Sequence, residues 1–364
     1  MATNRRHFLK ASLGAGAVGA LGNVDAAGPV EQPRKPVLDE YDPKNIKLAH
    51  RVPSGASDDE LLFLQQIGLR WARVELQAAE SDFDRLSAVQ KRFQRYGMRI
   101  FSAMHPAYRS LRIQLGQKGR DQDIETYQTF LRNCGRLGIP LANYDFHPGN
   151  TYTTATVQRR AYNAREFNLR DFRTKVEKPR FNRNYKAEEI WDHYTYFFKA
   201  VLPVAEKADV KLALHPDDPP LAMMNGVVKI FTHYDGYRRA EQLAGKSNHW
   251  GLTFCIGTWA EGGKEMGKDV FEMIRDFGRR GKIFDVHFRN VSAALPTFVE
   301  TFPDDGYLDM YRVMRDLRAV NFNGAMEPDH VPQLVGDKGI RPAGTAYCIA
   351  CMRSYLRRAN EEVG

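Results

Sequence analysis

The chain has 364 residues, of which 43% are hydrophobic, and a formal net charge of +9. This length suffices for one large barrel or two ordinary domains. The mildly basic balance favours an acidic small molecule or an acidic polysaccharide as partner and argues against a nucleic-acid-binding protein.

The N-terminus has the pattern of an export signal. Residues 4–10 read Asn-Arg-Arg-His-Phe-Leu-Lys, a twin-arginine motif, followed by an apolar run rich in Gly and Ala and a small-residue cleavage site at 24–26. The run is too short to span a bilayer, and no other segment approaches a membrane span. We therefore predict a signal peptide over 1–26, a Pro-rich linker over 27–43, and a soluble periplasmic mature protein that does not contact the membrane.

After the linker, strand and helix patterns alternate without interruption. Strands are predicted at residues 45–51, 69–76, 98–104, 139–146, 210–214, 250–254, 282–286 and from 324. Helices are predicted at residues 57–68, 83–96, 124–137, 188–208, 234–243, 268–277, 308–320 and 345–359.

Eight successive strand–helix units predict an α/β fold, a (β/α)8 TIM barrel that forms one catalytic domain over residues 44–360. Several helices end at a glycine directly before the next strand, as short connections require, for example at Gly68 and Gly97. A doubly wound sheet is the alternative, but no Gly-x-Gly-x-x-Gly turn supports a dinucleotide site.

Residues 151–186 interrupt the alternation after the fourth strand. This insertion contains ten Lys or Arg and three acidic residues, interleaved with aromatic residues. Because loops after barrel strands lie over the active site, the segment is predicted to act as a basic lid for an acidic sugar. A solvated loop and a subunit contact in a homo-oligomer are the alternatives.

Four residues at the ends of successive strands form the main candidate site: His215, Cys255, His287 and Asp329. They are separated by roughly 30 to 45 residues, the length of one barrel unit, and strand C-termini converge on one face of a barrel. Two imidazoles, a thiolate and a carboxylate suit Zn, Mn, Fe or Co better than Ca or Mg. Singly each could be a packing residue, but their common position predicts a metal site.

The strand ends carry motifs that resemble the mannonate dehydratase family, a branch of the xylose-isomerase-like barrels. The motifs are His-Pro-Asp-Asp-Pro-Pro at 215–220, Phe-Cys-Ile-Gly at 254–257, His-Phe-Arg at 287–289 and Pro-Asp-His at 328–330. The resemblance implies that the four candidate ligands hold a divalent ion, Mn2+ first, with Zn2+, Fe2+ or Co2+ as alternatives. It also implies dehydration of D-mannonate to 2-keto-3-deoxy-D-gluconate.

The resemblance also implies roles for the neighbouring residues. His330 is the first candidate for proton transfer, and Tyr347 corresponds to a family tyrosine. Asp217 is a further catalytic candidate, either at the sugar hydroxyls or behind the His215 ring, and Asp218 is expected to bind substrate. Arg289 is expected to face the substrate carboxylate.

Two more substrate-binding residues follow from looser matches. His147 ends the Asn-Tyr-Asp-Phe-His-Pro string at the fourth strand, and Arg165 lies in Ala-Arg-Glu-Phe within the insertion. The chain departs from the family at Glu327 and Val331, where the family has Arg and Gly, and at 152–155, where an arginine is lost. The substrate is therefore expected to be a small acidic sugar or a uronic-acid-containing saccharide, with D-mannonate as its model.

Three functions agree with these patterns. The first is a metal-dependent hydro-lyase that eliminates water, or another β-leaving group, from a sugar acid. The second is a sugar isomerase or epimerase on the same scaffold, and the third is a non-catalytic periplasmic sugar-binding protein.

Overall fold

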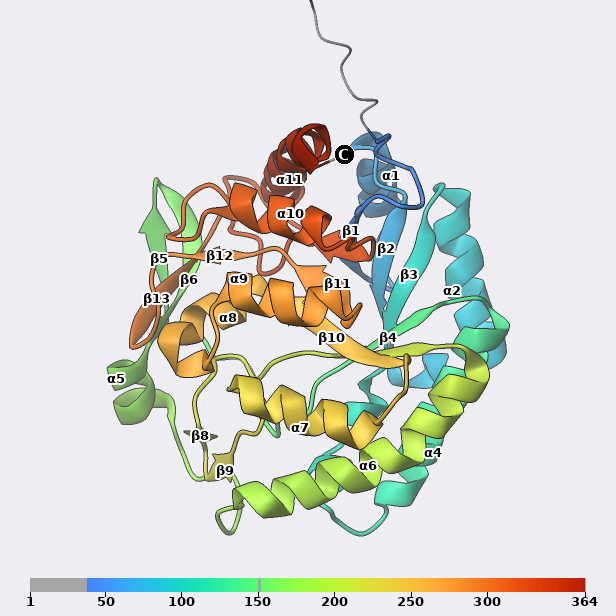
Figure 1. Cartoon of the computed structure of the whole chain (residues 1–364), viewed down its shortest axis with the longest axis vertical. Helices are drawn as coiled ribbons and strands as arrows, with labels where there is room; N and C mark the ends of the chain where they lie inside the picture. Colours follow the sequence, from blue (N-terminus) through green and yellow to red (C-terminus); the bar gives the residue numbers. More distant parts are fainter. Residues whose placement is uncertain (1–37, 150–151, 364) are drawn as a thin grey trace, which may run out of the picture. The chain divides into compact units, whose positions relative to one another are not determined.

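The computed structural model describes residues 38–149 and 152–363, and the predicted signal peptide and most of the predicted linker lie outside them. Eight parallel strands close into a barrel in which each strand pairs with its neighbours in chain order (Figure 1). The strands are β1 (Lys47–Pro53), β2 (Trp71–Glu75), β3 (Arg99–Met104), β4 (Leu141–Tyr144), β7 (Lys211–Leu214), β10 (Trp250–Cys255), β11 (Ile283–His287) and β14 (Ala325–Glu327). The prediction of a (β/α)8 barrel is therefore confirmed.

Helices follow the strands and surround the barrel (Figure 1). The longer ones are α1 (Asp58–Gln66), α2 (Phe83–Arg95), α4 (Arg120–Arg136), α6 (Ala187–Ala208), α7 (Tyr234–Ala244), α10 (Met310–Ala319) and α11 (Pro342–Val363). The predicted helix 268–277 is instead a short α-helical turn, α9 (Val270–Met273), continued by a π-helical turn, η5 (Ile274–Gly278). Among the described residues, no helix combines the length and apolar character of a membrane span.

Helix starts follow the local sequence rules. At α1, the Ser57 side chain accepts a hydrogen bond from the Glu60 backbone, and the Glu60 carboxylate accepts one from the Ser57 backbone. This reciprocal pair satisfies two of the free N–H groups at the first turn. Cys255 ends β10 and caps a short helix that sequence periodicity did not predict, α8 (Ile256–Gly262).

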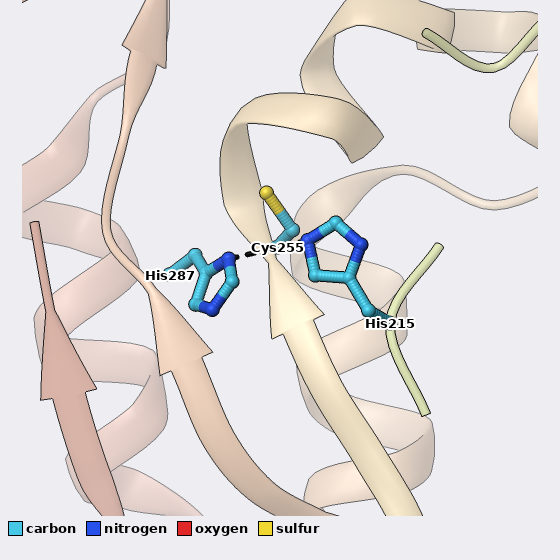
Figure 2. A group of neighbouring side chains, drawn as sticks. All are labelled: His215, Cys255 and His287. Carbon is cyan, nitrogen blue, oxygen red and sulfur yellow. Dashed lines mark hydrogen bonds between the residues drawn. The ribbon is translucent and has the colours of Figure 1, made fainter. Parts of the chain in front are cut away.

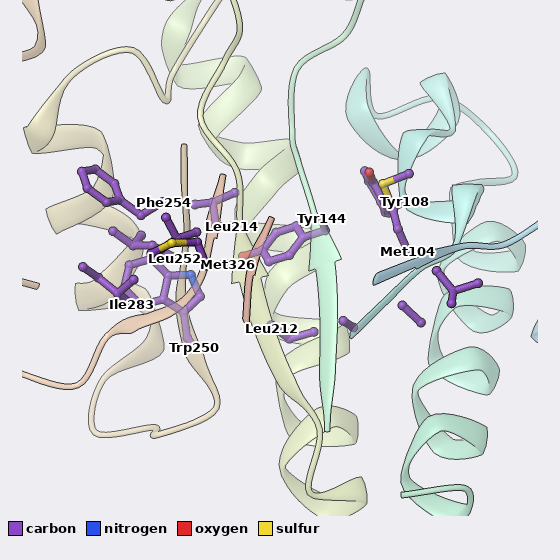
Figure 3. Close-up of a cluster of buried hydrophobic side chains, with 14 of the residues drawn as sticks. Met104, Tyr108, Tyr144, Leu212, Leu214, Trp250, Leu252, Phe254, Ile283 and Met326 are labelled. Atoms are coloured by element: carbon purple, nitrogen blue, oxygen red, sulfur yellow. The ribbon is translucent and has the colours of Figure 1, made fainter. Parts of the chain in front are cut away.

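The apolar core packs between the barrel strands and the helices. Figure 3 shows part of it, including the labelled side chains Leu212, Leu252 and Met326. Trp250 and Tyr144 belong to the same cluster and are almost completely buried. Because such a closely packed core is rigid, it fixes the positions of the strand ends and therefore of the side chains that follow them.

The basic insertion folds into a hairpin of β5 (Ala155–Arg159) and β6 (Tyr162–Asn168). Its two-residue turn, Arg160–Ala161, has positive φ at both positions, as hairpin turns of this length favour. The hairpin pairs with β13 (Thr297–Thr301), and β13 pairs with β12 (Asn290–Val291), so one four-stranded sheet joins two barrel loops (Figure 1).

The remaining elements are short and lie in the connections. They are η1 (Ala78–Ser81), η2 (Pro106–Arg109), α3 (Leu111–Gln114), α5 (Leu169–Asp171), η3 (Phe172–Val176), η4 (Gly263–Met266) and the ribbon of β8 (Met223–Met224) and β9 (Val227–Val228).

Candidate active site

The four predicted metal ligands come together at the C-terminal ends of β7, β10, β11 and β14. The Nε2 atom of His215 lies 3.2 Å from Nδ1 of His287, and Oδ2 of Asp329 lies 3.8 Å from the same Nδ1. The Sγ atom of Cys255 lies 3.9 Å from Oδ2 of Asp329. Figure 2 shows His215, Cys255 and His287 pointing toward one another from three elements.

Both imidazoles are oriented by a second partner. The Nδ1 atom of His215 lies 2.7 Å from the Pro216 carbonyl oxygen, and Nε2 of His287 lies 3.1 Å from Oε1 of Glu327. Nε2 of His287 also lies 3.2 Å from Nη1 of Arg73. A bound metal ion would require the two facing nitrogens, Nε2 of His215 and Nδ1 of His287, to be free of protons, which leaves the ring protons on the nitrogens next to Pro216 and Glu327. Oriented imidazoles of this kind are typical of metal-ligating histidines.

Three of the donors form a compact group that suits a first-row divalent ion, because the ligand atoms of His215, Cys255 and His287 all lie within 4.8 Å of one another. Asp329 lies at the edge of this group, with its carboxylate 3.8 Å from His287 and 3.9 Å from Cys255. Bonds of about 2.0 to 2.3 Å in a tetrahedral arrangement place donor atoms about 3.3 to 3.8 Å apart, close to the separations found here. Donor type agrees as well, because the set combines a soft thiolate with two imidazoles and a carboxylate.

The electrostatics of the cluster favour a cation. Burial opposes charge on His287, but Asp329, Cys255 and Glu327 outweigh it and raise the pKa of His287 to about 10. Burial would also raise the pKa of the Cys255 thiol, yet the Arg289 charge and hydrogen bonds from both histidines hold that pKa well below its usual range. The cluster is therefore suited to a thiolate and a bound positive charge.

A buried polar network inside the barrel supports the cluster. Glu327 lies 2.8 Å from Nη1 of Arg73, and both side chains are almost completely buried. Arg73 also donates from Nε to Asn143, which in turn donates to Thr253 and Asp285. None of these residues was identified as a supporting partner from the sequence, because each comes from a different strand and only the fold brings the five strands together.

Arg289 is not positioned to meet a substrate carboxylate. Its guanidinium is fully buried and lies 2.5 Å from Glu261, 3.0 Å from Glu300, 3.1 Å from Asp218 and 3.3 Å from Asp329. Because four carboxylates already surround it, the structure gives Arg289 a different position from the one expected from its place after β11.

A narrow cavity of about 60 Å³ opens beside the cluster. It is lined by His215, His287, Asp329, His330, Asp218, Arg51, Arg73, Tyr108, Arg109, Asn143, Tyr144, Asp145 and His147. Two of the predicted substrate-binding residues, Asp218 and His147, therefore border the space next to the ligands, as does His330. We call this space the inner cavity.

His330 and His147 each have a carboxylate beside the ring. The Nδ1 atom of His330 lies 2.9 Å from Oε1 of Glu300, and Nε2 of His147 lies 3.0 Å from Oδ1 of Asp145. His330 follows β14 and His147 follows β4, and these strands lie opposite each other in the closed barrel order. The backbone of His330 has φ of 46°, a strained conformation that is common at functional sites.

The other predicted site residues lie outside the inner cavity. Asp217 is buried behind His147, where it accepts a hydrogen bond from the Phe231 backbone and lies 3.8 Å from Nζ of Lys229. Tyr347 is 41% exposed on α11, and its hydroxyl donates to Asp304. Arg165 on β6 donates to Thr153 and lies 3.5 Å from Glu300.

Glu300 is a site residue that the sequence analysis missed. It lies on β13, in the loop between β11 and α10, and contacts both His330 and Arg289. The sequence shows only that Phe298 and Glu300 lie two positions apart in a short strand-like run, so that their side chains share one face. This pattern does not indicate which strand of another loop pairs with the run.

Known proteins resemble this chain over most of its length. Residues 161–360 match the family model described as D-mannonate dehydratase (UxuA), and residues 2–22 match the twin-arginine translocation signal sequence. The chain is 31% identical over 278 residues to mannonate dehydratase 2 of Halalkalibacterium halodurans, covering 69% of this chain and 79% of that protein.

Solved structures agree with the sequence matches. The crystal structure of mannonate dehydratase from Streptococcus suis superimposes with a TM-score of 0.75 at 27% identity, covering 86% of this chain and 96% of that one. A D-psicose 3-epimerase structure superimposes with a TM-score of 0.52 at 14% identity, covering 86% of this chain and 96% of that one, and shows a shared fold only.

Proposed function

The chain belongs to the mannonate dehydratase family and is a sugar-acid hydro-lyase, and from this premise we propose that it dehydrates D-mannonate or a close relative in a metal-dependent reaction. The observation that carries the proposal is the group of four donors at the strand ends, in which two oriented imidazoles direct nitrogens toward each other beside a thiolate and a carboxylate.

We propose that His215, Cys255, His287 and Asp329 hold the ion, with Mn2+ as the first candidate and Zn2+, Fe2+ or Co2+ as alternatives. When bound, such an ion would supply Lewis-acid chemistry that makes the proton at C2 of a sugar acid easier to remove.

Arg73 is the better-placed partner for the substrate carboxylate. It lines the inner cavity and is buried, while Arg289 does not line it. The Nε and Nη1 atoms of Arg73 already donate to Asn143 and Glu327. Its Nη2 atom lies 3.5 Å from the Met104 thioether, a weak acceptor, so the N–H groups of Nη2 remain available to an anion. The family's arginine before Pro-Asp-His is Glu327 here, and Glu327 in turn pairs with Arg73.

The two opposed imidazoles are suited to an elimination. Burial lowers the pKa of His147 despite the nearby carboxylate of Asp145, which keeps this imidazole neutral and able to accept a proton. The Glu300 carboxylate lies 2.9 Å from Nδ1 of His330 and orients the ring. We propose that His147 takes the C2 proton while His330 gives a proton to the C3 hydroxyl, which leaves as water. The resulting enol then tautomerises to the 2-keto-3-deoxy acid.

The other two hypotheses receive less support. An isomerase or epimerase shares the barrel, but the epimerase resemblance is limited to the fold at 14% identity. A non-catalytic binding protein does not need two carboxylate-backed imidazoles on opposite sides of one cavity.

The match to a twin-arginine signal supports a site of action outside the cytoplasm. We propose that the mature enzyme acts on an acidic saccharide in the periplasm after export by the twin-arginine route. If Arg5→Lys together with Arg6→Lys leaves the distribution between periplasmic and cytoplasmic fractions unchanged, this localisation is wrong.

Metal analysis with matched variants tests the proposed function. We expect about one equivalent of a first-row metal in the purified protein, and release of 2-keto-3-deoxy acid from D-mannonate or a related sugar acid. Cys255→Ala and His287→Ala should lose both, whereas Cys351→Ala, which alters a half-buried cysteine of α11, should keep both. A wild-type protein that neither contains nor takes up metal would exclude this mechanism.

A further inference from the structure

A second, wider cavity adjoins the inner one. It has a volume of about 250 Å³ and shares Arg51, Asp329 and His330 with the inner cavity. The two spaces therefore meet at the residues that border the proposed reaction centre. We call the second space the outer cavity.

The lining of the outer cavity contains three arginines and two acidic residues. Arg51 lies on β1, Arg165 lies on β6 and Arg341 lies in the loop before α11. Arg51 lies 2.8 Å from Glu75, which is the acidic residue of the lining apart from the proposed metal ligand. Arg341 donates to the Val331 backbone carbonyl and forms no ion pair among the described residues. Three elements that are distant in sequence thus bring guanidinium groups to one space.

A buried polar side chain in the same lining lacks a partner. His50 is 5% exposed, lines the outer cavity, and its Nδ1 atom has no hydrogen-bond partner among the described residues. Buried polar atoms are normally satisfied, so an unpaired one beside a cavity indicates a missing ligand or water. A neutral imidazole can bond with a sugar hydroxyl as donor or acceptor.

We propose that the outer cavity is a subsite for a second, negatively charged sugar residue attached to the sugar acid that reacts in the inner cavity. The inference rests on the proposed function and specifies its substrate class: a sugar acid that carries a uronosyl substituent. The arginines bind the uronosyl carboxylate through charge-assisted hydrogen bonds, and His50 bonds with a ring hydroxyl. A volume of about 250 Å³ lies just below the range of about 300 to 1,000 Å³ for drug-sized ligands, as expected for one sugar ring.

The residues shared by the two cavities explain why the reacting sugar acid and the uronosyl residue would belong to one molecule. His330 borders both cavities and is proposed to act at C3 of the sugar acid. A substrate whose reacting carbons lie beside His330 has its remaining carbons, C4 to C6, free to extend toward the outer cavity. A free aldonate in the inner cavity would not reach Arg341, the outer-cavity arginine for which the described residues supply no carboxylate.

Binding measurements on the metal-loaded enzyme test this subsite. Calorimetry would compare D-mannonate with D-mannonates that carry a glucosyl or a glucuronosyl residue at O4 or O6. We expect at least one glucuronosyl derivative to bind about tenfold more tightly than its glucosyl counterpart and than D-mannonate, as one added charge-assisted contact predicts. Equal or weaker binding of every glucuronosyl derivative would overturn the proposal.

Two variants separate the subsite from general effects. Arg341→Gln should abolish the tenfold preference for the glucuronosyl derivative. Arg170→Gln, which alters an exposed arginine of the basic insertion that lines neither cavity, should retain it. The comparison of ligands on the wild-type enzyme remains decisive if Arg341→Gln does not fold. If the enzyme dehydrates none of these acids, the proposed function is wrong. The ratio of the affinities for the glucuronosyl and glucosyl derivatives would still test the subsite independently.

Discussion

At the scale of single residues, the site depends on partners that orient the proposed metal ligands. Glu327 joins the Nε2 atom of His287 to the guanidinium of Arg73 in a fully buried arrangement. Removing one member of such a group leaves an uncompensated charge and frees the imidazole to rotate.

Glu327→Gln should therefore weaken metal binding about 10- to 100-fold and destabilise the protein by about 3 to 5 kcal/mol. Metal titration and urea unfolding would measure the two effects. Glu188→Gln, which removes an exposed ion pair with Arg239, is the matched control and should change stability by less than about 1 kcal/mol. Unchanged metal affinity in Glu327→Gln would show that Glu327 does not position His287.

The second residue-scale prediction concerns the base. His147→Gln should lower kcat about 10²- to 10⁴-fold, because one proton-transfer group is lost, with the metal content unchanged. Tyr347→Phe should keep kcat, since its hydroxyl pairs with Asp304 at the surface. Steady-state kinetics on the metal-loaded variants would decide between the two residues: a larger loss in Tyr347→Phe than in His147→Gln would reverse the assignment.

At the scale of elements, the sheet of β12, β13, β6 and β5 positions Glu300. Phe298 and Glu300 are separated by two positions on β13, so their side chains share one face. Phe298 packs at a ring distance of 5.5 Å against Phe167 of β6, within a small apolar cluster of its own. The insertion and the β11 loop therefore fold together, and each fixes the other over the barrel.

Phe298→Ala should lower the free energy of unfolding by about 3 to 5 kcal/mol and reduce activity, because Glu300 would no longer be held against His330. Phe298→Leu retains most of the apolar volume and should lose less of both. Leu62→Ala, at a side chain that is 42% exposed on α1, should change stability by less than about 0.5 kcal/mol. Full activity in a destabilised Phe298→Ala protein would contradict the positioning role of the sheet.

At the scale of the whole molecule, a neutral histidine is buried between the barrel and the loop that precedes α11. Burial lowers the pKa of His50 to about 4, despite the opposing charge of Glu327 and with a smaller contribution from Arg51. Between about pH 6.5 and pH 4, the unfolded chain binds a proton at this position that the native protein does not. Native stability should therefore fall as the pH falls through this window.

The loss in the free energy of unfolding reaches about 3 kcal/mol at pH 4, because the pKa of His50 differs by about 2.5 units between the unfolded and the native protein. Urea unfolding at a series of pH values from 7 to 4 would compare the wild type with His50→Gln, which cannot be protonated. We expect the variant to lose less stability on acidification. Parallel curves for the two proteins would show that His50 does not titrate as proposed.

Much of the architecture was predictable from the sequence because its determinants are local. Alternating strand and helix patterns with glycine at the helix ends indicate the barrel, and convergence of strand ends brings His215, Cys255, His287 and Asp329 together without further information. The family motifs surround these same strand ends. The expected substrate class follows from them as well.

The surroundings of these residues were decided only by the tertiary structure. Arg289 follows the right strand for a carboxylate-binding role, but Glu261, Glu300 and Asp218 reach it from three other segments and neutralise it. Arg73 lies in a strand that carries no recognised motif. Its contacts with Glu327 and Asn143, from two other strands, hold it at the inner cavity. A sequence specifies which groups a strand end presents, whereas their charge, access and orientation depend on partners that the fold brings from distant segments.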